Sequence, residues 1–443
     1  MKICSKSLIC CWLVLVANYA VSQTRLWGLT STGGTNGGGT IGFYELSSNS
    51  WVTEFNFSSA GGANPKGSLV LFAGKLYGMT AKGGANNRGV IFEYDPQTKI
   101  YTKKIDFSGD NGSTPSGSLT LFNDKFYGMT YEGGSKGYGV TFEWDPVTNV
   151  FEKKINWDAR YGYGAGPRGS LLLDNGTLYG MTTSGIGYDD AFWNGVAFNW
   201  NPATNAVRSS ALGYTFVGRN PEGSLVKLGT KFYGLTKLGG DYDGGALIEW
   251  DGTSIYKKYS FRGAFPTGSL IAVNSRLYGL AAGFGTSLGY VFSWDPATNT
   301  MQILANFDGD NGRSPFGSLS YSNGKLYGLT YAGGTNNLGT LFEFNLSTNV
   351  LEKKIDFSNA TGGNPYYTQL LEVAPEPISQ TINFEALPSK TYGDAEFSLT
   401  ATASSGLDVS YVSSDPSVAT LSGAKVTILK AGTTTITASQ AGN

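Results

Sequence analysis

Residues 76–80 read Leu-Tyr-Gly-Met-Thr, and versions of this segment recur along most of the chain. An aromatic residue followed by glycine marks each copy, at Trp27, Tyr77, Tyr127, Tyr179, Tyr233, Tyr278 and Tyr327. The successive spacings are 50, 50, 52, 54, 45 and 49 residues. A second marker, Pro-x-Gly-Ser-Leu, begins at Pro65, Pro115, Pro167, Pro221, Pro266 and Pro315, and Pro365 begins a degraded seventh copy. Such a period indicates a repeat architecture.

Each unit contains four short segments with strand character. In the second unit they are Ser68–Phe72, Lys75–Thr80, Val90–Tyr94 and Ile100–Phe107. Turn residues such as Asp95-Pro96 separate them, and no apolar pattern of helical period is present. The sequence therefore predicts an all-β fold in which each repeat is a four-stranded blade of a β-propeller.

The repeat also resembles two known families. Gly-Gly after the second strand and Tyr-Asp-Pro-x-Thr after the third, as at Gly83-Gly84 and Tyr94–Thr98, are similar to kelch repeats. The full unit, Gly-Ser-Leu … Leu-Tyr-Gly-x-Thr-x-x-Gly-Gly … Gly-x-x-Phe, resembles more closely the bacterial tandem-repeat family called GloVer, over residues 24–373. This resemblance implies an exported surface protein and brings no established activity with it.

The two ends of the repeat array predict how the ring closes. The first unit begins at its second strand, Leu26-Trp27-Gly28, whereas an extra first strand, Thr368–Val373, follows the last unit. Pairing these two ends gives a seven-bladed, kelch-like propeller with mixed-terminus ring closure. Closure of this kind removes the exposed sheet edges that an open array would have to protect.

The N-terminal segment has the features of a secretory signal peptide. Lys2 and Lys6 flank its start, an apolar stretch runs from Leu8 to Ala17, and small residues stand at Ala20 and Ser22. We expect residues 1–22 to be removed, together with all three cysteines, which leaves a mature chain secreted or held at the surface of a bacterium. No later stretch of the mature chain has the length and apolar character of a membrane span.

The composition changes after Val373, and glycine becomes less frequent. Residues 374–381, with Pro375 and Pro377, are predicted to form a short linker. Residues 382–443 resemble a bacterial Ig-like domain, on the basis of the segments 413–421 and 429–438. The sequence stops one strand short of such a domain, so we expect an incomplete Ig-like β-sandwich and a missing anchor.

Composition also excludes several classes of function. The chain has no histidine, which rules out Ser-His, Cys-His and His–zinc sites, and its net charge of −1 lacks the basic character of nucleic-acid-binding proteins. Asp241–Gly244 and Asp308–Gly312 resemble fragments of calcium loops, but Asp, Asn and Gly also favour simple turns. We expect a monomer with no cofactor, no metal and no catalytic set.

Irregular loops around the fourth blade form the candidate ligand site. Residues 158–168 lengthen the loop between two blades, and residues 184–194 bring aromatic and acidic side chains into the loop between strands two and three. Aromatic rings beside carboxylates and guanidinium groups suit a sugar, although the rings are equally able to pack against one another and order two long loops. The candidate ligand-binding residues are Arg160, Tyr161, Tyr163, Arg168, Tyr188, Asp189, Asp190 and Trp193.

Lysine pairs on the outermost strand of several blades are a second charged feature, at Lys103-Lys104, Lys153-Lys154, Lys257-Lys258 and Lys353-Lys354. We expect them to protect the sheet edge and to form ion pairs with glutamates of the third strand, rather than to bind a polyanion.

Taken together, these features predict an exported binding or scaffold protein that recognises a carbohydrate or a surface protein. The predicted binding surface is the loop face, the side of the propeller that carries the loops between strands two and three and the loops between blades. The alternative is a secreted carbohydrate-active enzyme, a hydrolase or lyase that works with Asp, Glu and Tyr. No pair of carboxylates stands out from the repeat background to support that alternative.

Overall fold

The computed structural model describes residues 24–159, 164–185, 194–213, 216–374, 381–387, 390–404 and 406–440. Residues Thr24–Val373 form one compact unit, and residues from Ala374 onward belong to another. Within the described residues all regular elements are β-strands, and there is no helix with the length and apolar character of a membrane span.

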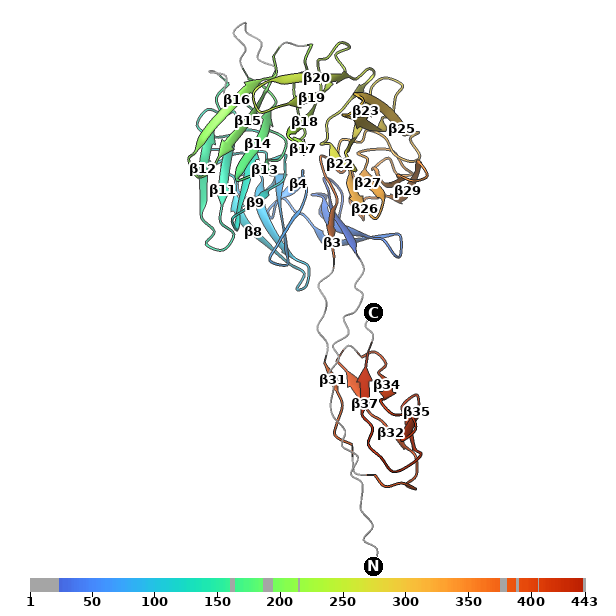
Figure 1. The fold of residues 1–443 in the computed structure, drawn as a ribbon. Coiled ribbons are helices and arrows are strands. Elements are labelled where there is room, and N and C mark those ends of the chain that lie inside the picture. Colours follow the sequence, from blue (N-terminus) through green and yellow to red (C-terminus); the bar gives the residue numbers. More distant parts are fainter. Residues whose placement is uncertain are drawn as a thin grey trace, which may run out of the picture. The chain divides into compact units, whose positions relative to one another are not determined.

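Seven antiparallel sheets make up the first unit and are arranged like the blades of a propeller (Figure 1). The strands, in chain order, are β1 (Arg25–Thr30), β2 (Thr40–Glu45), β3 (Ser50–Asn56), β4 (Ala63–Pro65), β5 (Val70–Phe72), β6 (Lys75–Lys82), β7 (Val90–Asp95), β8 (Ile100–Asp106), β9 (Thr120–Phe122), β10 (Lys125–Thr130), β11 (Val140–Trp144), β12 (Phe151–Asn156), β13 (Leu172–Asp174), β14 (Thr177–Thr182), β15 (Val196–Asn201), β16 (Ala206–Ala211), β17 (Val226–Leu228), β18 (Lys231–Thr236), β19 (Ala246–Trp250), β20 (Ile255–Ser260), β21 (Ala264–Phe265), β22 (Ile271–Val273), β23 (Arg276–Gly283), β24 (Tyr290–Asp295), β25 (Thr300–Asn306), β26 (Ser320–Ser322), β27 (Lys325–Leu329), β28 (Thr340–Asn345), β29 (Val350–Asp356) and β30 (Leu371–Val373).

Five of the sheets have four strands, and the other two carry a short additional strand, β4 or β21, at the end of their second strand. Blade 1 contains β1–β3 and β30, and the following blades are β4–β8, β9–β12, β13–β16, β17–β20, β21–β25 and β26–β29. The prediction of four short strands in each repeat is confirmed. The first predicted strand of the second unit is shorter than expected, because the Gly-Ser-Leu residues before β5 bond to neighbouring blades instead.

Blade 1 is assembled from both ends of the unit. Strand β30 pairs antiparallel with β1, so that Arg25 lies opposite Val373 and Trp27 lies opposite Leu371. This is the pairing expected from the ends of the repeat array. It covers the edge of β1 that would otherwise be open.

The apolar core is divided into seven clusters, one between each pair of neighbouring blades. The cluster between blades 7 and 1 joins Tyr44 and Leu26 to Tyr327 and Phe357, so the closing interface is packed like the others. Each cluster needs residues from two blades, because a single sheet cannot bury both of its faces.

Glutamates of the third strand hold the lysines of the outer strand, as predicted. Lys104 lies 3.1 Å from Glu93, and the same pairs form at Lys154–Glu143, Lys258–Glu249 and Lys354–Glu343. Each of these glutamates also accepts a hydrogen bond from the lysine that begins the second strand and, in blades 2, 3 and 5, from the marker tyrosine. The repeated tyrosine thus fixes a nearly buried carboxylate, a role that the sequence pattern did not reveal.

The second unit contains small sheets. Their strands are β31 (Ile382–Asn383), β32 (Phe397–Ser398), β33 (Thr402–Ala403), β34 (Ser410–Ser413), β35 (Ala419–Ser422), β36 (Lys425–Ile428) and β37 (Ile436–Ser439). Leu399, Ala419, Val426 and Ile436 form its buried cluster.

Candidate functional site

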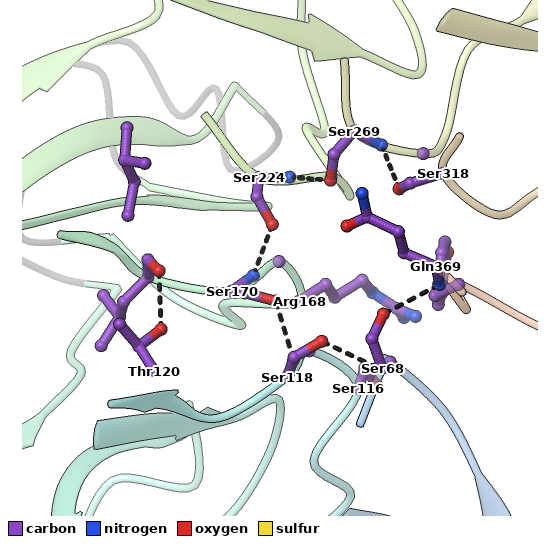
Figure 2. Close-up of a pocket in the computed structure, with 18 of the residues that line it drawn as sticks. Ser68, Ser116, Ser118, Thr120, Arg168, Ser170, Ser224, Ser269, Ser318 and Gln369 are labelled. Atoms are coloured by element: carbon purple, nitrogen blue, oxygen red, sulfur yellow. Dashed lines mark hydrogen bonds between the residues drawn. The ribbon is translucent and has the colours of Figure 1, made fainter. Parts of the chain in front are cut away.

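A cavity of about 330 Å³ lies where the innermost parts of the blades meet. Its wall consists mainly of the Gly-Ser-Leu segments that lead into the first strand of each blade (Figure 2). Arg168, Glu222, Tyr367 and Gln369 complete the lining. The most regular part of the repeat therefore surrounds the cavity, and a few non-repeated side chains are added to it.

Serines of neighbouring blades are joined in a chain of hydrogen bonds around this cavity (Figure 2). The backbone N–H of each serine donates to the side-chain oxygen of the next, at 2.8–2.9 Å: Ser68 to Ser118, Ser118 to Ser170, Ser170 to Ser224, Ser224 to Ser269, and Ser269 to Ser318. We call these six residues the serine ring. They explain why serine recurs at this position, since its short hydroxyl satisfies a backbone donor of the adjacent blade.

Glycine precedes each serine because the next blade approaches too closely for a side chain. A Cβ on Gly169 would lie 2.3 Å from the carbonyl oxygen of Gly223, and a Cβ on Gly117 would lie 2.3 Å from that of Gly169. The recurring Gly-Ser pair is therefore explained by the close approach of neighbouring blades at the cavity.

The serine ring closes through residues that depart from the repeat. Ser318 N donates to the carbonyl oxygen of Thr368, and Gln369 N donates to Ser68 Oγ at 2.8 Å. Gln369 stands where the other repeats have serine, and its side-chain Nε2 donates to the carbonyl oxygen of Leu319. The cavity is therefore asymmetric although the frame around it is repeated.

The residue before each Gly-Ser-Leu segment varies from blade to blade, and we call these positions the rim. They are Lys66, Ser116, Arg168, Glu222, Thr267 and Phe316, together with Tyr366 and Tyr367 in the degraded copy. The strands alternate in direction, so the rim lies on the same face as the loops between strands two and three and the loops between blades. This face is the loop face named in the sequence prediction.

Arg168 is the predicted site residue that the described structure contains, and it belongs to the cavity. Its guanidinium carbon lies 3.8 Å from the centre of the Tyr131 ring, and its Nε lies 4.0 Å from Glu222 Oε1. Burial lowers the pKa of Arg168, but the acidic groups of Tyr367 and Glu222 raise it by more, so that it lies above its ordinary value and the guanidinium stays charged.

Tyr367 reaches Glu222 from a distant part of the chain. Its hydroxyl donates to Glu222 Oε2, and Lys237 Nζ donates to Glu222 Oε1 at 3.2 Å. Tyr367 is the extra residue of the degraded copy, and its φ of 58° is unusual for a bulky side chain. Burial, followed by the charge of Glu222, raises the pKa of Tyr367 well above its ordinary value, so the residue is a neutral donor.

Lys66 adds a second cation to the rim. Its Nζ lies 5.2 Å from the centre of the Tyr366 ring, and it makes no ion pair with any residue that the structure describes. Burial and then the positive charge of Arg168 lower the pKa of Lys66, because the charged form is both desolvated and repelled. Tyr366 in turn packs against Phe316 and Tyr331.

The remaining predicted site residues lie outside the described residues. They are Arg160, Tyr161, Tyr163, Tyr188, Asp189, Asp190 and Trp193. Sequence reasoning missed Glu222, Tyr367 and Lys66, although one signal was available: the x of Pro-x-Gly-Ser-Leu varies where its neighbours do not.

Exposed aromatic residues follow the loop face beside blades 5 and 6. Tyr242 is 58% exposed and Phe284 is 65% exposed. Arg262 lies 5.3 Å from the centre of the Tyr242 ring, and Phe265 contacts Phe284 edge to face. Sequence reasoning missed these residues as well, because it looked for repeats with inserted residues, and these two repeats have none.

The two aspartate-rich segments have protein partners. Asp243 accepts hydrogen bonds from Gly239 N and from Arg219, and Asp308 accepts one from Asn311 N. Asp241 pairs with Lys257. The bonds from Gly239 and Asn311 are those of local turns, whereas Arg219 and Lys257 form ion pairs with aspartates distant in sequence. Within the described part of the chain no three acidic side chains are grouped as a metal site.

Comparison with known proteins gives a family and a fold. The model of the Gloeobacter/Verrucomicrobia repeat family matches residues 16–193 and 263–374. No curated protein sequence matches the chain.

Among solved structures, the chain is similar to the crystal structure of a "putative 6-phosphogluconolactonase" from Bacteroides uniformis, with 14% identity and a TM-score of 0.52, over 79% of this chain and 99% of that one. A second such protein, from Bacteroides fragilis, matches with 14% identity and a TM-score of 0.52, over 79% and 98% of the two chains. The β-propeller domain of the Trilobed protease from Pyrococcus furiosus matches with 11% identity and a TM-score of 0.43, over 78% and 98%. At these identities the likeness concerns the fold alone.

Proposed function

We propose that this chain, which belongs to the Gloeobacter/Verrucomicrobia repeat family, is an exported binding protein that recognises a carbohydrate through the rim and loop face of a seven-bladed propeller. Export is inferred from residues 1–22, which have the features of a signal peptide. In this proposal the propeller is kelch-like, and residues 382–443 are part of a bacterial Ig-like domain that serves as a spacer.

One observation carries the proposal: a repeated frame surrounds the cavity, whereas the rim around it is varied. The serine ring and its glycines recur almost unchanged, but the rim includes Lys66, Arg168, Glu222 and Tyr367, which differ in charge and size. A uniform frame supports stability, and varied residues around a cavity supply the few placed polar groups that specify a ligand.

A carbohydrate suits this site better than an apolar ligand. The wall offers serine hydroxyls and backbone groups, and the loop face also exposes Tyr242 and Phe284, whose rings provide stacking surfaces for the C–H face of a sugar. A protein partner is the competing ligand class, and it is separated from a sugar by the experiment below.

A carbohydrate-active enzyme is the second candidate, and Tyr367 with Glu222 is the observation in its favour. A hydroxyl hydrogen-bonded to a carboxylate at a cavity is the arrangement of a nucleophile and its base. The raised pKa of Tyr367 counts against it, and Glu222 is already held by Lys237. Binding without turnover is therefore the favoured function.

The experiment is a glycan array probed with the mature protein, followed by product analysis of each bound glycan. Saturable binding without product supports a binding protein, and release of product supports the enzyme. Arg168→Ala should weaken the binding, whereas Arg88→Ala, a matched exposed arginine in the loop of blade 2, should not. Absence of binding to any glycan would refute the proposed function.

A further inference from the structure

The rim carries more positive charge than the described carboxylates neutralise. Among the described residues, Glu222 is the carboxylate within ion-pair distance of Arg168, but its two oxygens already accept hydrogen bonds from Lys237 and Tyr367. The closest approach of Arg168 to it is 4.0 Å, which is long for a charge-assisted hydrogen bond. Arg168 therefore has donors that the described residues do not fully use.

Lys66 strengthens this imbalance. It forms no ion pair with any described residue, and its nearest aromatic neighbour is the ring of Tyr366. The charged groups acting on Lys66 are Arg168 and Lys82, which repel it, and Glu222 and Glu132, which attract it. Lys237 and Arg168 both lie within 4.0 Å of Glu222, and Lys66 adds a cation without an ion pair among the described residues, so an anion entering the rim would be attracted.

The cavity below the rim is rich in hydrogen-bond donors. Each serine of the ring uses its side-chain oxygen to accept a backbone N–H, and no acceptor among the described residues receives the hydroxyl protons. Figure 2 shows Arg168 extending among these serines. A site with a guanidinium and several hydroxyl donors suits a ligand that has both a negative charge and oxygen acceptors.

We propose that this cavity binds the carboxylate-bearing residue of an acidic glycan, that is, a uronic acid. The guanidinium of Arg168, which lies over the Tyr131 ring, pairs with the carboxylate, and the serine ring donates to the ring and hydroxyl oxygens of the sugar. Lys66 contributes a second positive charge at the entrance. The inference rests on the proposed function and specifies its ligand class.

The size of the cavity favours one sugar residue. A volume of about 330 Å³ is at the small end of the range of roughly 300–1,000 Å³ found for small-molecule sites. The cavity can therefore hold a single uronate residue, whereas the rest of a longer glycan would extend over the loop face. The planar, two-pronged geometry of a guanidinium also matches a carboxylate.

The test is a calorimetric titration of the full mature chain with D-glucuronate and D-galacturonate, and with D-glucose and D-galactose as neutral counterparts. We expect a uronate to bind at least about tenfold more tightly than its neutral counterpart, with an affinity that falls as salt rises. Arg168→Gln should weaken uronate binding by about ten- to a hundredfold and weaken the binding of neutral sugars by a smaller factor. Arg168→Lys keeps the positive charge but loses the two-pronged guanidinium, so its affinity for uronate should lie between those of the unaltered protein and Arg168→Gln.

Arg88→Gln is the control, because it removes one positive charge from the same face without lining the cavity. Thermal melts of all variants show that they are folded. Equal binding of uronates and neutral sugars, or uronate binding that survives Arg168→Gln, would overturn this inference while leaving a sugar-binding function standing. Displacement of uronate by equimolar sodium sulfate would identify an inorganic-anion site and also overturn it. If neither sugar class binds, both proposals fail.

Discussion

The hydroxyl of Tyr367, at the entrance of β30 in blade 1, donates a hydrogen bond to the carboxylate of Glu222, at the entrance of β17 in blade 5. The two residues are 145 positions apart in sequence, and the bond spans the ring across its cavity. Both side chains are buried, with Glu222 5% and Tyr367 9% exposed. The strained backbone of Tyr367 must be compensated by this contact and its packing.

The first prediction tests that bond. Tyr367→Phe should lower the free energy of unfolding by about 1–3 kcal/mol, because the buried Glu222 loses a donor that water does not replace. A double-mutant cycle with Glu222→Gln, measured by urea unfolding, should give a coupling energy clearly different from zero. Strictly additive effects of the two substitutions would contradict the contact.

The second prediction concerns ring closure. Ending the chain after Tyr366 removes β30, exposes the edge of β1 and breaks the bond from Gln369 N to Ser68 Oγ. The melting temperature should fall by roughly 5–10 °C, and the truncated protein should aggregate through its free edge. A chain ending after Ala374 is the control, since it keeps β30. Identical melting of the two chains would show that the pairing is not formed.

The third prediction concerns the glycine before the serine of blade 4. Gly169→Ala should destabilise the protein by at least about 2 kcal/mol, because the new Cβ would meet the carbonyl oxygen of Gly223 at 2.3 Å and push two blades apart. Gly61→Ala is the control, because its Cβ would have ordinary contacts at 3.6 Å. Chemical unfolding measures both, and similar losses would argue against close approach at the cavity.

The fourth prediction is a pH dependence of stability. Burial opposes the ionisation of Glu143, but hydrogen bonds from Lys125 and Tyr127 outweigh it and lower the pKa of Glu143 in the folded state. A lowered folded pKa stabilises the protein above the unfolded pKa, and this contribution disappears as pH falls through the folded value. Stability should therefore decline from about pH 5 towards pH 3. Glu143→Gln should be less stable at neutral pH and show a shallower decline.

Asp124→Asn is the matched control for that experiment, because Asp124 lies in the exposed turn between β9 and β10 of the same sheet and forms no ion pair with any described residue. Its unfolding curve between pH 3 and 7 should follow that of the unaltered protein. An unchanged acid decline in Glu143→Gln would show that this buried carboxylate does not contribute to it.

The fifth prediction addresses the blade-four loops named from the sequence. If these loops take part in glycan recognition, Trp193→Ala should lower the affinity for a bound glycan about thirtyfold, the effect of losing a stacking aromatic. Lys136→Ala, an exposed residue in the corresponding loop of blade 3, is the control. Equal effects of both substitutions on every glycan would favour the packing explanation.

Local chemistry explains why the strands were predictable. Asp95 accepts hydrogen bonds from the backbone of Gln97 and Thr98, so the Asp-Pro turn is formed by residues adjacent in sequence. The repeated Leu-Tyr-Gly segment alternates with turns in the same way in each unit, and the ion pairs of the outer lysines follow from strand order alone. Features of this kind depend only on contacts between strands that are adjacent in the sequence, so the sequence pattern is enough to predict them.

The site was less predictable, because its residues come from different repeats. Length irregularities led the sequence prediction to the fourth blade, which gave Arg168 but neither Glu222 nor Tyr367. No pattern in the sequence pairs two residues separated by 145 positions. The exposure of the Phe284 ring was not predictable for a related reason, since the exposure of a side chain depends on what the neighbouring loop covers.

The sequence by itself determined the repeated strands and their turns, because these depend on short-range hydrogen bonding and on a pattern that recurs in every unit. It also predicted the pairing of the first and last segments, because the first unit lacks the strand that follows the last unit. Only the tertiary structure decided that Ser116, Arg168 and Glu222, from the x positions of three repeats, line one cavity and that Arg168 lies 4.0 Å from Glu222 there. The physical reason is closure of the ring. Joining β30 to β1 brings the start of every blade to a common centre, where charged side chains from distant repeats interact with one another.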